Sequence, residues 1–493
     1  MPLAPLDPLL ALDDSTLASL TAVFRERGFT PDAFALTERT QPGQLPGVRD
    51  PFVRRVLDRT PGPVATLLGL FVYGYETPRD AVRDALGEPL MTVLRDVLVL
   101  PGTQAHLVRS PFQVQPIGEQ WFVSDPLEGG TLAVMGPGAT TLILHEYAAR
   151  FAAARALDLG CGAASLAIAA AARGARATAT DVNARALTLA AFNARLNRVP
   201  LDVRASDVGA ALRGETYDLV LGQPPYLADP HAAPVTFLHG GAYGDEIAWR
   251  FVHDAARLLA PGGTALLLFD YPQRTGTRLA ERIAAAIGDA HAGYAAISRP
   301  GASLDQAAAH VAAVGHPSLG AEWEREARAY RDHYDALGIT AFTNVLLVVQ
   351  RPGADGAVLP RIVVEHHGRK PPEPGVLADW LAGIHAAARP DDALLECVLA
   401  PLPGAVFAGV WTHPAHESPA SLRVEFPEGA FATNRELGDR GWLLFGLLDG
   451  TRTLREAVAP FAEACDVAPA AAEVDVLGFA REGLARGMLQ VRR

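Results

Sequence analysis

The chain has 493 residues, with 49% hydrophobic and 20% charged side chains and a formal net charge of −12. This length predicts about three domains with buried cores and argues against disorder over most of the chain. The acidic balance disfavours non-specific binding to nucleic acid, which depends on neutralising phosphates, but it leaves room for a local arginine-lined cleft.

Cysteine usage and the chain start bear on the compartment. The three scattered cysteines, Cys161, Cys397 and Cys465, are too few for a disulfide framework or a zinc cluster. The first residues lack a basic region and turn acidic at once, which is not typical of a secretory signal. The apolar runs are far shorter than the roughly 20 residues of a membrane helix. We therefore expect a cytoplasmic protein with no membrane role.

Residues 1–128 are expected to form a helical, winged-helix-like domain. Helical patterns cover residues 15–100, with Ser15 and Thr16 as possible caps. The predicted elements are a first helix after Ser15, two helices within 64–87 broken at Thr77–Pro78, a third at 90–100, and strands at 107–118 and 120–125. Substrate recognition and simple packing are both open roles for such a module.

Residues 129–351 change to alternating strands and helices. Strands are expected at 154–160, 177–182, 201–206, 217–223, 264–271 and 344–351, and helices at 164–174, 184–197, 248–263 and 322–338. Strands that alternate with helices of about 10–15 residues predict a parallel, doubly wound sheet, so the fold class is α/β and Rossmann-like.

Residues 357–493 follow a linker of sequence RPGADG and are expected to form an α+β region. Its predicted strands are 361–367, 405–411 and 421–426, and its predicted helices lie within 441–450, 453–465 and 474–489. The helical end resembles a small winged-helix or carrier-like module. A protein-contact or packing role for it is at least as well supported as nucleic-acid binding.

A glycine turn follows the first strand of the predicted sheet, in the sequence Asp158-Leu-Gly160-Cys-Gly162. Glycines permit a positive φ and a close approach of ligand to backbone, while the following helix start offers free N–H groups. The pattern alone also suits a structural turn or a dinucleotide-binding loop. Cys161, inside the turn, is predicted to fill space and not to act as a nucleophile.

Acidic residues end the next two strands. Asp181 can accept hydrogen bonds from both ribose hydroxyls of an adenosyl ligand, and dinucleotide enzymes place an acid similarly. Asp207 is placed to read an adenine amine, with a helix N-cap as its alternative role. Val182 and Val208, which follow these acids, complete this part of the predicted cofactor set.

The fourth strand runs into Gln223-Pro224-Pro225-Tyr226, the motif that favours methyl transfer over hydride transfer. Prolines stiffen the turn and remove donors, so it presents acceptors. The Gln223 side-chain oxygen and the Pro224 carbonyl are expected to hold a planar NH₂ group while Tyr226 packs on its face. Such positioning supplies the orientation that in-line transfer to a weak nucleophile needs.

Taken together, these motifs resemble class I S-adenosylmethionine-dependent methyltransferases, specifically the release-factor glutamine N5-methyltransferases and their "small-domain" relatives. The order QPPY, then GGAYGDE, a helix and PGG matches that group, and Gln223 stands where the family has Asn. The resemblance implies S-adenosylmethionine as cofactor, with Thr140 in the loop near its methionine part and Gln223 bordering both cofactor and acceptor. No metal is expected, because the sulfonium is already an activated electrophile.

Several histidines and one tyrosine are weaker candidates. His231, His239 or Tyr243 could line the acceptor pocket, although a surface-loop role is favoured for each. His366 and His367 lack a third nearby ligand, which argues against a metal site.

The sequence thus predicts N-methylation of a planar amino or amide group in a macromolecule, with a protein glutamine as the leading acceptor. Methylation of an exocyclic amine of adenine, guanine or cytosine in rRNA or DNA is the alternative within the enzymes. A non-catalytic module that kept the cofactor pocket is the alternative from another class, and an NAD oxidoreductase is more distant. The oligomeric state is left open.

Overall fold

The computed structural model describes residues 3–37, 46–126, 130–231, 237–353, 359–366, 371–410, 419 and 421–492. The chain divides into two compact units, which we call unit 1 (Met1–His291 with Pro300–Arg351) and unit 2 (Ala292–Arg299 with Pro352–Arg493). The division into domains 1–128, 129–351 and 357–493 stays a prediction. No described helix is long and apolar enough to cross a membrane.

The first part of unit 1 is mostly helical. Its helices are α1 (Asp7–Leu10), α2 (Asp14–Glu26), η1 (Pro31–Leu36), α3 (Pro46–Arg59), α4 (Pro63–Leu67), η3 (Leu68–Val72), α5 (Arg79–Leu86) and α6 (Glu88–Val93). The N-cap of α2 is Asp13, whose carboxylate accepts the Thr16 N–H at 2.7 Å.

Two details differ from the sequence-based expectation here. The first helix expected within 64–87 is α-helical only to Leu67, continues as the π-helical turn η3 and ends at Val72. The predicted break at Thr77–Pro78 is confirmed, because these residues form strand β1 (Thr77–Pro78). The helix expected over 90–100 was wrong in its second half, because α6 ends at Val93 and Asp96 has a left-handed φ of 64°.

Short strands complete this part. Strand β3 (Leu107–Arg109) lies between β1 and β2 (Leu100–Pro101), and β4 (Gln113–Ile117) pairs with β5 (Gln120–Ser124) as an antiparallel hairpin. The apolar faces of these helices and strands pack into one core that also includes Leu189, Phe192 and Leu196 from helix α9 (Ala184–Leu196). The helical part of unit 1 therefore shares a core with a helix of the large sheet.

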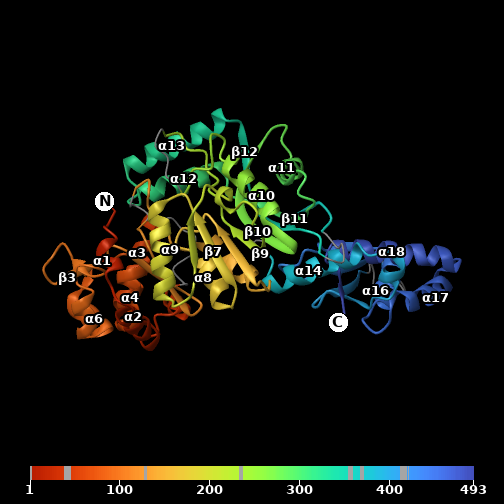
Figure 1. Ribbon diagram of the computed structural model, residues 1–493. Coiled ribbons are helices and arrows are strands. Elements are labelled where there is room, and N and C mark those ends of the chain that lie inside the picture. Colours follow the sequence, from red (N-terminus) through yellow and green to blue (C-terminus); the bar gives the residue numbers. More distant parts are fainter. Residues whose placement is uncertain are drawn as a thin grey trace. The chain divides into compact units, whose positions relative to one another are not determined.

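The large sheet of unit 1 has the strand order β12-β10-β9-β6-β7-β8. Its strands are β6 (Arg155–Leu159), β7 (Arg176–Asp181), β8 (Asp202–Ala205), β9 (Tyr217–Gly222), β10 (Leu259–Arg274) and β12 (Ile339–Gln350). Its helices, besides α9, are α7 (Ala139–Ala148), α8 (Ser165–Ala172), α10 (Glu246–Leu258), α11 (Leu279–Ile287), α12 (Leu304–Gly315) and α13 (Ala321–Ala336). Figure 1 shows α8 and α9, in yellow, beside β7.

Neighbouring strands from β10 to β8 are parallel, which confirms the α/β, Rossmann-like fold. β12 runs antiparallel to β10, so the expectation of a wholly parallel sheet was wrong at this strand. The chain builds β6, β7 and β8 toward one edge and then returns to place β9 on the other side of β6. This reversal leaves a crevice outside the carboxyl ends of β6 and β9, where ligands of such sheets bind.

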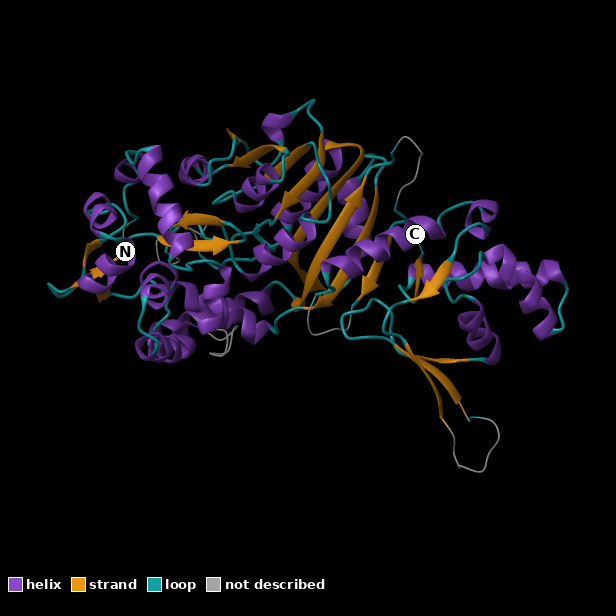
Figure 2. Cartoon of the chain, turned by 90° about the horizontal axis from the view of Figure 1, so that it is seen from below, coloured by secondary structure: helices purple, strands orange, loops and turns teal. Residues whose placement is uncertain are grey.

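Unit 2 is α+β. Strand β11 (Gly293–Pro300) pairs in parallel with β13 (Ile362–Glu365), and β15 (Val406–Val410), β16 (Ser421–Glu425) and β17 (Arg435–Leu437) form an antiparallel sheet whose arrows stand out in Figure 2. The remaining elements are α14 (Pro374–Ala387), α15 (Asp391–Leu395), β14 (Leu399–Pro401), α16 (Asp439–Leu447), α17 (Leu454–Cys465), α18 (Pro469–Ala485) and β18 (Leu489–Val491). The winged-helix assignments at both ends of the chain stay predictions.

Candidate active site

The glycine turn follows β6, at the carboxyl end predicted from the sequence. Gly160, Gly162 and Ala164 all have left-handed backbones, with φ of 64°, 51° and 59°. A Cβ added to Gly160 would lie 2.8 Å from Cζ of Phe251, whereas one added to Gly162 would meet no atom nearer than 3.9 Å. Gly160 is thus required by packing as well as by φ, whereas a Cβ at Gly162 would make only ordinary van der Waals contacts.

Asp158 ends β6 inside the protein, with 3% of its surface exposed. One carboxylate oxygen accepts the Ala167 N–H at 3.1 Å, which satisfies a free donor in the first turn of α8. Burial raises the pKa of Asp158 to about 8, and the nearby Asp181 charge adds to the rise. Burial also raises the pKa of the Cys161 thiol, so this cysteine is poorly disposed to form a thiolate.

Asp181 lies at the end of β7 and faces the glycine turn. Its carboxylate accepts the Gly162 N–H at 3.0 Å and the Asn183 N–H at 2.8 Å, while burial raises its pKa. The next residue, Val182, exposes 66% of its surface despite being apolar. An exposed valine beside a carboxylate gives one edge of the site a flat apolar surface next to a hydrogen-bond acceptor.

Asp207 follows β8 and forms an ion pair with Arg250 at 2.6 Å. Its alternative role as an N-cap was wrong, because the short helix η5 (Ala210–Leu212) begins after Gly209 with no side-chain cap. Val208 has a left-handed φ of 51° and is buried.

The Gln223–Tyr226 turn leaves β9 beside the glycine turn. The Gln223 side-chain oxygen accepts the Thr141 hydroxyl at 2.8 Å, and its NH₂ group donates to the Thr140 hydroxyl oxygen. Both threonines come from the first turn of α7, so the Gln223 amide is held at both ends. An amide oxygen has two acceptor positions, and one remains for a ligand donor. Tyr226 is half-buried, and burial together with the Asp270 carboxylate raises its pKa well above the usual range.

A glycine-rich loop lies next to this turn. The Leu227 N–H donates to the Leu238 carbonyl at 2.9 Å, and the Gly240 N–H donates to the Leu227 carbonyl at 2.8 Å. Neither glycine tolerates a Cβ. One added to Gly240 would lie 2.2 Å from the Gly244 carbonyl oxygen, and one added to Gly244 would lie 2.7 Å from the Ala228 nitrogen. The two segments therefore pack backbone against backbone.

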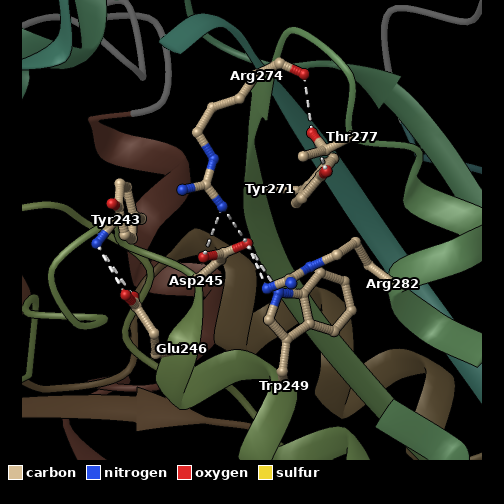
Figure 3. Close-up of polar contacts among 8 residues, drawn as sticks. All are labelled: Tyr243, Asp245, Glu246, Trp249, Tyr271, Arg274, Thr277 and Arg282. Carbon is tan, nitrogen blue, oxygen red and sulfur yellow. Dashed lines mark hydrogen bonds and ion pairs between the residues drawn. The ribbon is translucent and has the colours of Figure 1, made fainter. Parts of the chain in front are cut away.

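The loop ends in a buried carboxylate that three donors share. Asp245, 1% exposed, accepts the Trp249 ring N–H at 2.8 Å and one guanidinium nitrogen each from Arg274 and Arg282 at 3.3 Å. Figure 3 shows these groups converging, with Tyr243 lying over the Arg274 guanidinium at 4.4 Å. This cluster ties the loop to β10 and α11.

One cavity of about 420 Å³ collects the predicted residues. Its lining includes Thr141, Asp158, Gly160, Gly162, Asp181, Val182, Asp207, Val208, Gln223, Pro224, Pro225 and Tyr226. Thr140 does not line the cavity, but its hydroxyl accepts a hydrogen bond from Gln223, which does line it. The structure therefore brings the predicted set together around one space, while the binding and catalytic role of each residue stays a prediction.

Among the weaker candidates, only His239 lines this cavity. Its Nδ1 atom is buried and has no hydrogen-bond partner among the described residues. His231 instead bonds to Glu326 at 2.6 Å, and Tyr243 belongs to the Asp245 cluster. His366 is buried, His367 lies outside the described residues, and the described residues hold no group of three or more potential metal ligands.

Two buried polar residues that hold the segments around the site together, Asn193 and Asp125, were not predicted from the sequence. Buried Asn193 accepts the Val123 N–H at 2.8 Å and donates to the carbonyls of Val123 and Ala163 at 3.0 Å, which joins β5 to the glycine turn. Asp125 is 1% exposed, and both of its carboxylate oxygens accept hydrogen bonds from the Arg185 guanidinium. One of these oxygens also accepts the Val134 N–H at 2.9 Å. These polar groups sit within apolar helix and strand patterns, which give no sign of their partners.

The cavity lining contains two chemically distinct groups of residues. The carboxylates, the glycine turn and the exposed Val182 suit a ligand with hydroxyls and a flat ring. The stiff Gln223–Tyr226 turn offers acceptors to a planar donor group.

Comparisons with known proteins agree with this geometry. Residues 137–287 match the family model described as the methyltransferase small domain. A release factor glutamine methyltransferase of Deinococcus radiodurans is 36% identical over 156 residues, which cover 29% of this chain and 55% of that protein. One of Xylella fastidiosa is 33% identical over 134 residues, covering 25% and 48%. The chain thus spans about half the length of the curated relatives it matches.

Among solved structures, the 16S rRNA N2 methyltransferase of T. thermophilus in complex with AdoMet and guanosine is 19% identical. The alignment covers 43% of this chain and 58% of that protein's chain, with a TM-score of 0.28.

Proposed function

We propose that this chain, which carries a class I S-adenosylmethionine-dependent methyltransferase domain at residues 137–287, is an enzyme that N-methylates a planar amide or amino group in a macromolecule. The leading acceptor is a protein glutamine side chain, the group on which the release factor relatives are named. The observation that carries the proposal is the junction of the glycine turn and the Gln223–Tyr226 turn in one cavity. The scattered cysteines support a cytoplasmic location for it.

The cofactor half of the cavity fits S-adenosylmethionine by its donor set and its space. Asp181 would accept hydrogen bonds from the ribose hydroxyls, Val182 would pack on the adenine, and the cavity beside the glycine turn would admit the amino-acid part. Asp207 adds a second carboxylate beside the ligand, and Asp158, whose pKa burial raises to about 8, would contribute hydrogen-bonding oxygens and little charge near neutral pH. When bound, the cofactor supplies a methyl group on a sulfonium.

The protein's own contribution is to position the acceptor. Gln223, held by Thr140 and Thr141, presents its remaining acceptor position to one N–H of the acceptor, and the Pro224 carbonyl receives the other. Tyr226 covers the face of the planar group and excludes water. With both protons engaged, the nitrogen lone pair is directed along a fixed line, which is the orientation that transfer needs.

Gln223 in place of Asn has a structural reason in this proposal. Its extra methylene lets the amide reach the two hydroxyls of α7, so the longer arm is pinned by contacts that a shorter side chain would not make. We therefore expect Gln223→Asn to lower transfer more than cofactor binding.

The test separates the two halves of the cavity. Asp181→Ala should weaken cofactor binding in a calorimetric titration, and unchanged affinity would refute its role. Gln223→Ala should keep cofactor affinity and abolish transfer of labelled methyl, with Thr141→Val as an isosteric control that removes one hydrogen bond to Gln223.

The acceptor class is read by incubating the full chain with labelled cofactor and the protein, RNA and DNA fractions of a cell extract. Label in protein at glutamine supports the proposal. Label in RNA or DNA at an exocyclic amine would replace glutamine by a base, and no label in any fraction despite cofactor binding would favour a non-catalytic module.

A further inference from the structure

Unit 1 has a second, more open cavity of about 790 Å³. It lies between α10, α11 and η5, and four arginines line it together with small alanine side chains. The arginines are Arg213, Arg250, Arg257 and Arg282. We call this cavity the arginine groove.

The arginines are held to different degrees. Arg282 is fixed, because its guanidinium lies over the Trp249 ring at 5.2 Å and donates to the buried Asp245. Arg257 pairs with Asp254 at 3.3 Å on the protein surface, while that carboxylate also accepts the Gly209 N–H at 2.8 Å. Arg213 is exposed and forms no ion pair with any described residue. Arg250 pairs with Asp207 at 2.6 Å. The groove thus combines three arginines that have carboxylate partners with one, Arg213, that has none among the described residues.

The charge of the groove runs against the charge of the chain. Four guanidinium groups and two carboxylates, Asp207 and Asp254, line the groove, whereas the whole chain carries −12. The buried Asp245 pairs with Arg282 from outside the lining, which leaves a small positive excess. Asp207 lines both the arginine groove and the candidate active site, so the two spaces adjoin. The groove thus adjoins the Asp207 side of the cavity, and an acceptor protein large enough to span the cavity would also contact these arginines.

We propose that the arginine groove binds an acidic segment of the acceptor protein, a stretch with glutamate or aspartate side chains near the methylated residue. This proposal rests on the function proposed above. Arginine binds carboxylates through two parallel hydrogen bonds, and the alanines Ala210, Ala285 and Ala286 leave room for an extended main chain.

A nucleic-acid strand fits these observations less well. Phosphodiester binding depends on many uncompensated cations, and the groove has only a small positive excess on a strongly acidic protein. A peptide segment whose few carboxylates are separated by neutral residues matches that small excess.

The experiment measures binding to the full chain by fluorescence anisotropy, with a labelled glutamate-rich peptide as the probe. The same peptide with glutamine at each glutamate position and a labelled oligouridine of equal charge are the comparison probes. The key variant is Arg213→Ala with Arg257→Ala. Arg325→Ala with Arg328→Ala, which removes equal charge from exposed positions on α13, is the matched control.

We expect the groove variant to bind the glutamate peptide about fivefold more weakly, the control pair to bind it as the parent does, and added salt to weaken parental binding. Lysine at both groove positions should retain part of the affinity. Equal binding by the groove variant and the parent, no binding of the glutamate peptide by the parent, or tighter binding of oligouridine would each overturn the proposal. Arg213→Glu alone, at an exposed position with no ion-pair partner among the described residues, should also weaken binding of the glutamate peptide.

Calorimetric titration of every variant with S-adenosylmethionine separates the two proposals. Cofactor binding tests the active site, and neither Arg213 nor Arg257 lines the active-site cavity. Loss of peptide binding with normal cofactor binding therefore concerns the groove alone, and absent cofactor binding in the parent concerns the proposed function alone.

Discussion

Replacing Gly160 with alanine should destabilise unit 1 through two separate effects. The backbone at Gly160 is left-handed, which costs a residue with a Cβ about 1–2 kcal/mol. The new methyl group would also lie 2.8 Å from Cζ and 3.3 Å from Cε1 of the buried Phe251 ring. Because Gly222 packs against the same ring, with a built Cβ 3.0 Å from Cδ1, the ring has little room to move. Overpacking of this kind costs about 1–3 kcal/mol, so the total is about 2–5 kcal/mol.

Gly162→Ala is the matched control, because its φ of 51° is similar but its added Cβ would touch nothing closer than 3.9 Å. It should cost only the backbone part, about 1–2 kcal/mol. Denaturant unfolding of both variants, followed by circular dichroism, gives the two values.

A double-mutant cycle tests the cause of the difference. In the Phe251→Leu background the clash is relieved, so Gly160→Ala should cost less there, with a coupling energy of about 1–3 kcal/mol. Equal costs for Gly160→Ala and Gly162→Ala, or additive effects with Phe251→Leu, would refute the packing explanation of Gly160.

Three further predictions concern buried polar groups. Asp158 binds its proton more tightly in the folded protein, with a pKa of about 8 against an ordinary 3.8, so its contribution to stability should fall as pH rises through that window. Unfolding midpoints at several pH values should therefore slope less in Asp158→Asn than in the parent, and identical slopes would contradict the assignment. Arg185→Ala leaves the Asp125 carboxylate buried without its cation and should cost about 3–5 kcal/mol in denaturant unfolding, whereas Arg204→Ala, at an exposed ion pair, should cost less than about 1 kcal/mol. Asn193→Ala removes hydrogen bonds to Val123 and Ala163 and should lower the melting temperature by several degrees; a melting temperature equal to the parent's would argue against that role.

The local motifs of the site were predictable because each lies at the end of one strand. A strand that ends in Asp158-Leu-Gly160, and another that ends in Gln223-Pro224, can be recognised one segment at a time. Parallel strands then bring their carboxyl ends to one edge without further information.

Residues whose role depends on a distant partner were not predictable. Phe251 reads as one more apolar residue of an amphipathic helix, and only the position of α10 shows that its ring separates Gly160 from Gly222. Asn193 reads as a polar interruption of α9, although it is fully buried. The antiparallel direction of β12 was also missed, because the pattern of apolar residues in a buried strand is the same in both directions.

The core that the N-terminal helices share with α9 limits how this chain can be recombined with others. Leu189, Phe192 and Leu196 are buried by side chains from α2 and its neighbours, so they belong to two modules at once. A chimera that grafts the catalytic segment onto a foreign N-terminal module would leave this apolar stripe bare unless the donor module brings a complementary surface. In recombination, therefore, the N-terminal helices would have to be exchanged together with the α9 residues that they cover, although the sequence motifs of the candidate site begin only at β6.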